Sequence, residues 1–345
     1  MKKHRGAIIG FGKVAAEAHL PGFRQAPGFE IAAVVEPAEE QRARALAALP
    51  GVRVYADLAA AAQAEPKLEF VDVATPPRQH APSVIDALER GYHVLCEKPL
   101  ALDLGEIGEL RRAARRSHHT VFTVHNWKYA PLFRRLHGLL RAGAIGEVRD
   151  IHWQVLRPSP PQGAAEAGWR LDREQAGGGI LMDHGWHAFY LMLFLAGRDP
   201  QSIVARLGAE LGFGVEDAAH CEIDFAELRA TIELRWGAAE RRTAGVVHGS
   251  LGEIAIEDDR LVVKVAGREP EGTRFSPSLS ASSYHPEWFP ALLEDFRAEI
   301  EHVARRGRNL AEAVRVAELM AAAYRSNGAA ISVAAPEPGT AQEPV

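Results

Sequence analysis

The sequence is poor in cysteine and in long apolar runs, and neither sign of charge predominates. Its 2 cysteines, Cys96 and Cys221, are far apart and form no paired motif, so neither a disulfide framework nor a structural zinc site is expected. No apolar run approaches the roughly 20 residues of a membrane span. The short apolar stretch after the charged N-terminus is interrupted by glycine, unlike the core of a signal peptide. The formal net charge of −5 comes from interspersed acids and bases, which argues against a basic face for nucleic acid. We therefore expect a cytoplasmic location, with neither a membrane nor a nucleic acid as partner.

Histidine is abundant, with 15 residues, but the sequence offers no convincing metal site. The nearest candidates are the pairs His118/His119 and His184/His187, and neither is joined by Cys or Glu at a ligand spacing. No metal is predicted.

The first 125 residues alternate short apolar segments with stretches rich in Ala, Glu, Arg and Leu. The apolar segments predict strands near 6–10, 31–35, 52–55, 69–74, 92–96 and 120–125. Helices are predicted between them, for example over 39–49 and 83–90. This alternation is typical of an α/β fold with a parallel sheet covered on both faces and a ligand crevice beyond the carboxyl ends of its strands. A chain of 345 residues commonly forms two domains, and we assign residues 1–125 to the first of them.

A glycine-rich turn follows the first predicted strand. The segment Ala7-Ile8-Ile9-Gly10-Phe11-Gly12-Lys13-Val14-Ala15 places the pattern Gly-x-Gly-x-x-Ala between an apolar run and a helix-like stretch. In a dinucleotide-binding turn Gly10 permits the sharp bend, Gly12 leaves room for a pyrophosphate, and Ala15 lets the helix pack on the strand. The start of that helix offers N–H groups and a positive dipole end to the phosphates. The turn therefore predicts a nicotinamide cofactor, although an ordinary strand–helix turn can carry the same pattern.

Glu36 favours NAD over NADP. It ends the second predicted strand, near the roughly 20-residue spacing from the glycine turn that is expected of a carboxylate bonding the ribose hydroxyls. A carboxylate at this position would repel the 2′-phosphate of NADP. The alternative is an ordinary solvated acid at the end of a strand.

The pattern changes after residue 126. A helix over 131–142 and a segment over 148–156 precede strand-like runs at 202–211, 217–225, 229–236, 243–249, 253–257 and 261–265. Successive strands with short turns predict an open, mostly antiparallel sheet. Helices over 289–305 and 310–325 close this second domain, assigned to 126–330, and Asn309 with Glu312 predicts a capping box for the last helix. The Pro-, Gly- and Glu-rich residues 331–345 predict a disordered tail.

Two loops after predicted strands carry candidate site residues. Glu97-Lys98-Pro99 follows the strand that ends at Cys96, so Lys98 places a cation in the cofactor crevice, where it can hold a substrate hydroxyl and favour its deprotonation. The proline fixes the backbone and is a candidate for a cis peptide bond. Thr75-Pro76-Pro77, followed by His80, forms an extended loop that can pass beside a ribose. A surface lysine and a rigid turn are the simpler alternatives.

A further candidate follows the triplet Gly177-Gly178-Gly179. If a helix begins near Ile180, Asp183 and His187 are four residues apart and share a face, whereas His184 lies about 100° round the helix from Asp183. An acid and an imidazole on one face suit acid–base work: His187 can take a proton from an alcohol near neutral pH, and Asp183 can bind the substrate or orient the imidazole. From spacing alone, a helix-start acid beside a buried histidine is an equally good interpretation.

Taken together, these segments resemble the Gfo/Idh/MocA oxidoreductase family, named after glucose–fructose oxidoreductase and inositol dehydrogenase. The resemblance spans roughly residues 5–330, and the motifs follow the family's order along the chain. They are Gly10-x-Gly12, Glu36, Ala74-Thr75-Pro76-Pro77 with His80, Glu97-Lys98-Pro99, Asn126, Trp169-Arg170, Gly178-Gly179, Asp183-x-Gly185-x-His187 and the turn over 248–254.

The resemblance implies a Rossmann-type domain followed by an α/β domain whose open sheet often forms an oligomer interface, and hence a homodimer or homotetramer. It also implies tightly held NAD, a sugar or cyclitol substrate, and a catalytic set formed here by Lys98, Asp183 and His187. The residues implied to bind the cofactor are Gly10, Phe11, Gly12, Lys13, Val14, Glu36, Thr75, Pro76, Pro77, His80, Glu97, Lys98 and Asn126. Those implied to bind the substrate are Lys98, Asn126, Lys128, Trp169, Arg170, Asp183, His184 and His187.

Two positions depart from the family pattern. Lys128 stands where many members have arginine, which changes the polar contacts available to a substrate. The acid usual just after the turn with the catalytic histidine is absent, since Tyr190 and Leu191 occupy that region. Neither departure removes the catalytic groups.

The sequence thus predicts an NAD-dependent dehydrogenase that oxidises a secondary alcohol of a sugar, sugar derivative or cyclitol, or performs the reverse reduction. Two alternatives stay open. The same site serves a glycosidase or lyase if one sugar carbon is oxidised only transiently, and a redox-inert regulator if the protein merely senses NAD(H). The intact set of Lys98, Asp183 and His187 argues against the regulator.

Overall fold

The apolar segments of the first 125 residues form strands, as predicted, in a computed structural model that describes residues 3–160, 167–326 and 328–333. The strands are β1 (His4–Ile9), β2 (Phe29–Val35), β3 (Arg53–Tyr55), β4 (Phe70–Val73), β5 (His93–Cys96) and β6 (Val121–Thr123). They pair in parallel in the order β3-β2-β1-β4-β5-β6. This is the strand order of the Rossmann dinucleotide-binding sheet, so the predicted fold of this part is confirmed.

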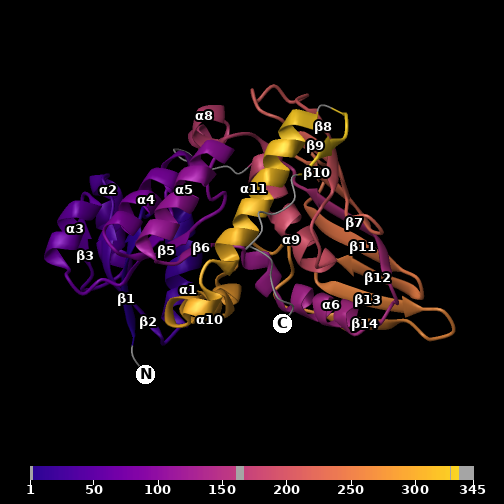
Figure 1. Cartoon of the computed structure of the whole chain (residues 1–345), viewed down its shortest axis with the longest axis horizontal. Helices are drawn as coiled ribbons and strands as arrows, with labels where there is room; N and C mark the ends of the chain where they lie inside the picture. Colours follow the sequence, from indigo (N-terminus) through magenta and orange to yellow (C-terminus); the bar gives the residue numbers. More distant parts are fainter. Residues whose placement is uncertain (1–2, 161–166, 327, 334–345) are drawn as a thin grey trace. The chain divides into compact units, whose positions relative to one another are not determined.

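The chain divides into two units, coloured along the sequence in Figure 1. The first comprises Met1–Asn126 and Tyr284–Val314, and the second comprises Trp127–Ser283 and Arg315–Val345. The boundary predicted at residue 125 lies beside the observed one. The return of Tyr284–Val314 to the first unit was not predicted from the sequence.

Helices join the strands of the first unit and lie along its sheet. They are η1 (Ala15–His19, a π-helical turn), α1 (Leu20–Arg24), α2 (Glu39–Ala48), α3 (Leu58–Ala64), η2 (Pro77–Gln79), α4 (His80–Glu89), α5 (Leu104–Ser117), η5 (Pro286–Trp288), α10 (Phe289–Glu301), η6 (Val303–Arg305) and the first part of α11 (Arg308–Ser326). Figure 1 shows α4 and α5 side by side, and the two helices are in contact. Asp57 and Asp103 cap α3 and α5 by accepting the backbone N–H of Ala60 and Glu106.

Aromatic packing explains why the segment 284–314 belongs to the first unit. Phe296 of α10 is fully buried, and its ring centroid lies 5.9 Å from that of Phe29, 5.8 Å from that of Phe70 and 5.6 Å from that of Phe122. Three strands of the sheet therefore supply the surface on which α10 packs. Since burial of large aromatic side chains dominates core energetics, this helix completes the core of the first unit.

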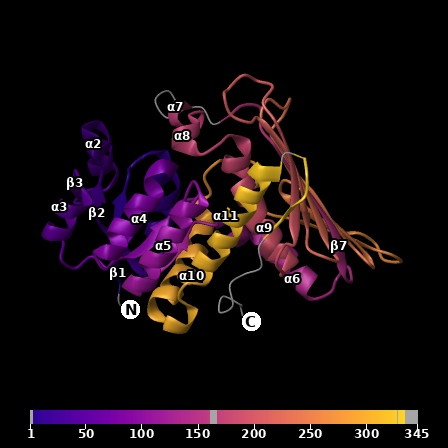
Figure 2. The ribbon, with the colours of Figure 1, turned by 45° about the horizontal axis from the view of Figure 1, so that its top comes forward.

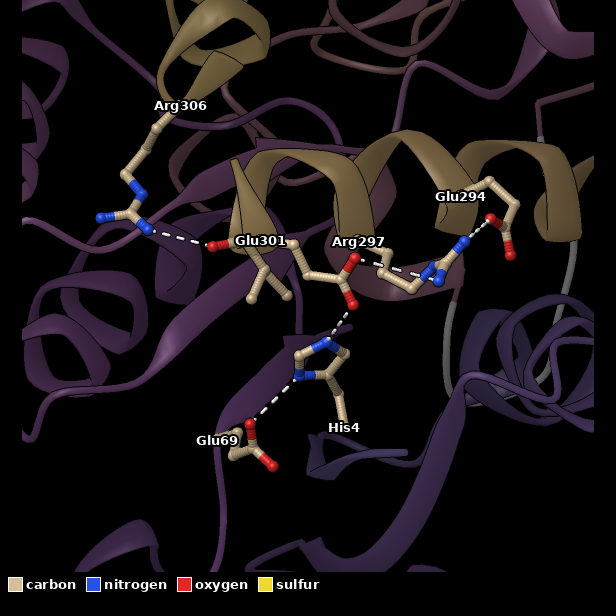
Figure 3. Close-up of polar contacts among 7 residues, drawn as sticks. His4, Glu69, Glu294, Arg297, Glu301 and Arg306 are labelled. Carbon is tan, nitrogen blue, oxygen red and sulfur yellow. Dashed lines mark hydrogen bonds and ion pairs between the residues drawn. The ribbon is translucent and has the colours of Figure 1, made fainter. Parts of the chain in front are cut away.

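Polar contacts also tie the end of α10 to the sheet (Figure 3). His4 of β1 is buried, with Nδ1 3.1 Å from a Glu69 carboxylate oxygen and Nε2 3.2 Å from one of Glu301. Arg297 pairs with Glu301 at 3.9 Å, and Arg306 donates to the carbonyl oxygen of Ile300 at 3.0 Å. The end of the helix is thus held at both its side chains and its backbone.

The predicted capping box at the start of α11 was wrong. Asn309 Oδ1 accepts the Thr123 N–H at 2.5 Å and its amide donates to the Thr123 carbonyl at 3.1 Å, while Glu312 lies 2.5 Å from Nδ1 of His125. Both side chains therefore hold the end of β6. Glu299 of α10 caps the start of α11 instead, since its carboxylate accepts the N–H groups of Gly307 and Asn309 at 2.9 and 2.8 Å.

The second unit is built on a larger sheet. Its strands are β7 (Val148–Leu156), β8 (Ser202–Gly208), β9 (Ala218–Asp224), β10 (Arg229–Arg235), β11 (Arg242–Gly249), β12 (Gly252–Glu257), β13 (Arg260–Val265), β14 (Glu271–Arg274) and β15 (Ile331–Ser332), in the order β14-β13-β12-β11-β7-β10-β9-β8-β15. Within the described residues every pair is antiparallel except β7 with β10. The predicted mostly antiparallel sheet is therefore confirmed.

Two short strands were not predicted. β14 continues the sheet beyond β13, and Ile331–Ser332 pair with Ile203 and Ser202 of β8. The tail predicted to be disordered thus begins with a paired strand, and its part from residue 334 lies outside the described residues.

Helices of the second unit cover one face of its sheet, as Figure 2 shows for α6 (Pro131–Arg141) and α9 (Trp186–Ala196). The remaining helical segments are η3 (Asn126–Tyr129), α7 (Ala167–Arg170), α8 (Arg173–Ala176) and η4 (Leu181–Gly185, a π-helical turn). Alternate residues of β10, namely Ala230, Ile232 and Leu234, are buried, as expected for a strand with one face in a core. Among the described residues, no helix combines the length and apolar character that crossing a membrane requires.

Truncation of Phe296 tests the packing of α10. We expect Phe296→Ala to lower the free energy of unfolding by about 3–5 kcal/mol, the usual cost of removing a fully buried phenylalanine ring. Chemical denaturation measures this loss, and Val303→Ala, whose side chain is 74% exposed on the same returning segment, is the matched control. A loss no larger than that of the control would contradict the packing described here.

Candidate functional site

The glycine turn after β1 lies against the loop after β4. Gly10 has a φ of +85°, and a Cβ at this position would lie 3.0 Å from Thr75 Cγ2 and 3.1 Å from the backbone of Ala74. Since L side chains rarely adopt such a φ, glycine is required here. The side chain of the next residue, Phe11, is buried in the core, and its backbone N–H donates to Glu36 Oε2 at 2.8 Å.

Glu36 is held beside this turn at the end of β2. Its second carboxylate oxygen accepts the N–H of Ala38 at 2.9 Å, and the residue is 8% exposed. Each carboxylate oxygen has a further lone pair, so Glu36 can still accept hydrogen bonds from ribose hydroxyls. The N–H of Phe11, a residue predicted to bind the cofactor, orients Glu36.

The residues around the turn fit a bound NAD. Residues 12–14 are partly exposed at the start of the helix, whereas Phe11 and Ala15 on either side are buried. Thr75 Oγ1 is buried and has no hydrogen-bond partner among the described residues. An open helix start receives phosphate groups, and a buried hydroxyl without a partner beside it is explained by a ligand. Gly12, Lys13 and Thr75 would hold the cofactor, with the partly exposed Pro76 alongside.

His80 fastens the loops after β4 and β5 to each other. Its ring is buried, with Nδ1 2.6 Å from the Pro99 carbonyl oxygen and Nε2 2.8 Å from that of Thr75. The Lys98–Pro99 peptide bond is cis. Both ring nitrogens contact backbone oxygens, so His80 supports these two loops, and the cofactor contact predicted for it stays a prediction. Pro77 is likewise buried at the start of the turn that leads to His80.

Three ionisable side chains form a buried chain beneath Lys98. His19 is fully buried, with Nδ1 2.8 Å from an Asp72 oxygen and Nε2 2.9 Å from Glu97 Oε1. The other oxygen of Glu97 accepts the backbone N–H of Lys98 at 3.0 Å. Each oxygen of Glu97, also predicted to bind the cofactor, therefore has one partner within the protein.

The charge state of this chain follows from its surroundings. Burial alone would lower the pKa of His19, but the charge of Asp72 and the hydrogen bonds of both carboxylates raise it to about 10. Burial raises the pKa of Asp72, and the adjacent imidazolium only partly offsets this. His19 is therefore a cation at neutral pH, and it holds Glu97 and the backbone of the partly exposed Lys98 in place.

In the second unit, glycines let the helix with Asp183 begin against another backbone. A Cβ on Gly179 would overlap the carbonyl oxygen of Glu216, and one on Gly178 would overlap the hydroxyl of Tyr324. The Glu216 side chain accepts both the Gly179 N–H and the Tyr324 hydroxyl at 2.7 Å, and its carbonyl accepts the Ile180 N–H at 2.9 Å. Glu216 thus fixes the first turn of the helix from two sides.

Polar residues reach the surface of this helix at a few positions. Of residues 180–192, Asp183, His184 and His187 are partly exposed and the others are buried. His184, expected about 100° round the helix from Asp183 and on another face, has its Nε2 3.7 Å from Asp183 Oδ2, so the two side chains meet. Both residues lie on the π-helical turn η4, where an α-helix was expected.

The imidazole of His187 is held at its edge and on its face. Nδ1 lies 2.9 Å from the hydroxyl oxygen of Tyr190, which also accepts the backbone N–H of Trp127 at 2.9 Å. The Trp127 ring stacks on the imidazole, with ring centroids 5.4 Å apart. These contacts leave His187 one orientation near the partly exposed Asp183 and His184.

The remaining predicted substrate residues lie on short helical segments. The Arg170 guanidinium stacks over the Trp169 ring at 4.2 Å on α7. Lys128 lies 5.7 Å above the Tyr129 ring on η3, which begins with the partly exposed Asn126. Both cations thus lie over an aromatic face.

The structure therefore gathers the predicted residues in two sets. In the first unit the glycine turn, Glu36, the Thr75 loop and Lys98 follow the carboxyl ends of β1, β2, β4 and β5. In the second unit Asp183, His184 and His187 share one helix.

Several supporting residues were missed from the sequence. Asp72 gave a signal, because an acid inside an apolar strand must find a partner when it is buried. His19 is that partner, 53 residues away, and Glu216 lies 37 residues from the Gly179 that it holds. No local pattern links such distant positions.

Comparison with known protein families gives two matches. Residues 4–125 match the family model described as "Oxidoreductase family, NAD-binding Rossmann fold". Residues 133–255 match the "GFO/IDH/MocA C-terminal domain". Each match falls within one of the two units.

Individual relatives agree with this result. The 1,5-anhydro-D-fructose reductase of Ensifer adhaerens is 28% identical over 293 residues, which cover 81% of this chain and 85% of the relative. The D-apiose dehydrogenase of Paraburkholderia graminis is 35% identical over 147 residues, or 42% and 38% of the two chains. Among solved structures, a levoglucosan dehydrogenase in complex with NADH has a TM-score of 0.84 at 21% identity, covering 96% of this chain and 100% of the other. The last likeness concerns the fold.

The raised pKa of His19 predicts a pH dependence of stability. The pKa of His19 is about 10 in the folded state and about 6.5 in the unfolded chain. The charged imidazole therefore contributes fully to the free energy of unfolding below pH 6.5, and this contribution is lost as the pH rises through 10. We expect His19→Gln to destabilise the protein at pH 7 and to flatten the loss of stability between about pH 6.5 and 10, measured by chemical denaturation. His302→Gln, at an exposed position, is the control. Equal pH profiles for His19→Gln and the unmodified protein would refute a charged His19.

Proposed function

This chain belongs to the Gfo/Idh/MocA oxidoreductase family, and on that premise we propose that it oxidises a secondary alcohol of a sugar, sugar derivative or cyclitol with NAD, or performs the reverse reduction. The observation that carries the proposal is the setting of Lys98. This cation follows β5 of the NAD-binding sheet, and Glu97 fixes its backbone. The names of the relatives, an anhydrofructose reductase and an apiose dehydrogenase, support a sugar-type substrate.

The catalytic set that we propose is Lys98, Asp183 and His187. His187 takes the proton of the reacting hydroxyl, as an imidazole does near neutral pH. Lys98 donates a hydrogen bond to the same oxygen and stabilises the negative charge that develops on it. Asp183 accepts hydrogen bonds from substrate hydroxyls. Bound NAD supplies the acceptor for the hydride, while the protein supplies position and electrostatics.

Other polar residues select the substrate in this proposal. Arg170 and Trp169 form a stacked pair that can grip a sugar through the guanidinium donors and the indole face. Asn126 and Lys128, both partly exposed on η3, bond neighbouring hydroxyls, and His184 beside Asp183 contributes a further polar contact.

Glu36 supports NAD as the cofactor in preference to NADP. Its carboxylate is fixed next to the glycine turn by the N–H groups of Phe11 and Ala38. A negative charge in a fixed position favours ribose hydroxyls and repels a 2′-phosphate.

A homodimer or homotetramer through the sheet of the second unit is also part of the proposal. Partly exposed side chains of several strands, among them Gln154, Thr231 and Arg242, line a shallow depression on this sheet. A broad sheet face of this kind suits association with a second copy. Light scattering of the purified chain decides between one, two and four copies, and a monomer would refute this part.

A panel of sugars, cyclitols and sugar nucleotides tests the reaction. We expect net formation of NADH, followed at 340 nm, with at least one free sugar or cyclitol and with NAD preferred to NADP. Cleavage of glycosides without net NADH would instead indicate a glycosidase or lyase that oxidises its substrate transiently. Absence of both, with NAD bound, would indicate a regulator.

Removal of the Lys98 ammonium tests its catalytic role. We expect Lys98→Ala to lower turnover by at least about tenfold, since charge stabilisation at the reacting oxygen is lost, while NAD still binds. Lys67→Ala, which removes an exposed lysine of the same unit, is the control. Near-normal turnover of Lys98→Ala would remove the lysine from the mechanism.

A further inference from the structure

Tyr190 has a buried hydroxyl with defined partners. The residue lies on α9, three positions after His187, and it is fully buried. Its oxygen lies 2.9 Å from Nδ1 of His187 and accepts the backbone N–H of Trp127, also at 2.9 Å. A buried phenol needs such partners, because an unbonded hydroxyl away from water is costly.

The backbone contact fixes where the hydroxyl can lie. Trp127 N–H belongs to η3, and the Trp127 ring stacks on the imidazole at an interplanar angle of 27°. One residue thus holds both the phenol, through its backbone, and the imidazole, through its ring. The Tyr190 oxygen therefore stays at Nδ1 rather than moving with the side chain of His187.

From this geometry we propose that Tyr190 is the positioning residue of His187: it occupies Nδ1 and so assigns Nε2 to the proton of the substrate hydroxyl. The inference rests on the proposed function of His187 as the base. In the step itself the substrate O–H bond breaks and an Nε2–H bond forms. The hydrogen on carbon leaves as hydride to the bound NAD, and Tyr190 keeps its own proton.

The chemical nature of the partner matters as well as its position. Among the described contacts of the His187 imidazole are the Tyr190 hydroxyl from α9, the Trp127 ring from η3 and the His184 ring from η4, whose centroid lies 6.5 Å away; His184 in turn lies beside Asp183. The group bonded to Nδ1 is a neutral phenol, which orients the ring by hydrogen bonding without placing a full negative charge on it. Orientation is therefore the main effect of Tyr190.

A double-mutant cycle tests this assignment. We expect Tyr190→Phe to lower kcat by about tenfold, with KM for the sugar within about twofold, because only the alignment of the base is lost. In the His187→Ala background the same change is expected to have no further effect on residual turnover, since a residue that acts through His187 has nothing left to act on. Tyr92→Phe, which removes a hydroxyl from a buried tyrosine of the first unit, is the control. Wild-type kcat in Tyr190→Phe, or an equal loss with and without His187, would overturn the proposal.

A readout without turnover separates this inference from the proposed function. In ring-labelled protein, we expect the NMR titration of His187 to move in Tyr190→Phe and to stay in place in Tyr92→Phe. Normal turnover of His187→Ala would refute the assignment of His187 as the base. Separately, a His187 titration that does not move in Tyr190→Phe would refute the proposed role of the Tyr190 contact. Should Tyr190→Phe not fold, difluorotyrosine at position 190 keeps the shape and acidifies the hydroxyl. An unchanged His187 titration in that variant also counts against the proposal.

Discussion

Buried charge at the carboxyl ends of β4 and β5 is the interaction on which the site of the first unit depends. His19 comes from the helical turn after the glycine loop, Asp72 from β4, and Glu97 from the end of β5. Ions in a protein interior are costly unless they are paired and hydrogen-bonded, so these three side chains stabilise the fold only in this arrangement. The imidazolium thereby couples the element that begins at the phosphate-binding turn to the backbone of Lys98. The glycine turn and the proposed catalytic ammonium of Lys98 are therefore held by the same buried side chains.

In the second unit, hydrogen bonds to the Glu216 carboxylate and the Tyr190 hydroxyl hold the helix that carries Asp183 and His187. A buried helix has to bring polar side chains to its surface, and its first turn lacks partners within the helix. Glu216 satisfies that turn from outside, while Tyr190 holds the edge of His187. The close approach at Gly179 leaves no space for a side chain, which explains the run of glycines as a packing requirement. Residues far apart in the sequence, such as Gly179 and Glu216, therefore restrict the side chains that each other's positions can accommodate.

Local features of this fold could be predicted from the sequence, whereas distant contacts could not. Most strands of both sheets and the turn at Gly10 follow from the apolar pattern and from the steric freedom of glycine, both of which are local, whereas β14 and β15 were not predicted. The return of α10 to the first sheet depends on Phe296 meeting Phe29 and Phe70, residues separated from it by most of the chain. Asn309 matches a capping pattern, yet the backbone of Thr123 competes successfully for its side chain. The π-helical turn at Asp183 likewise gives no sign in the residue spacing.

The central claim is that an ammonium and an imidazole act on one substrate oxygen beside the bound NAD. A crystal structure of the complex with NAD and a reacting sugar tests it most directly. The account predicts Lys98 Nζ and His187 Nε2 both within about 3 Å of the same hydroxyl oxygen, with Nδ1 still on Tyr190. A reacting hydroxyl bound by neither side chain, or one that meets His187 through Nδ1, would contradict it.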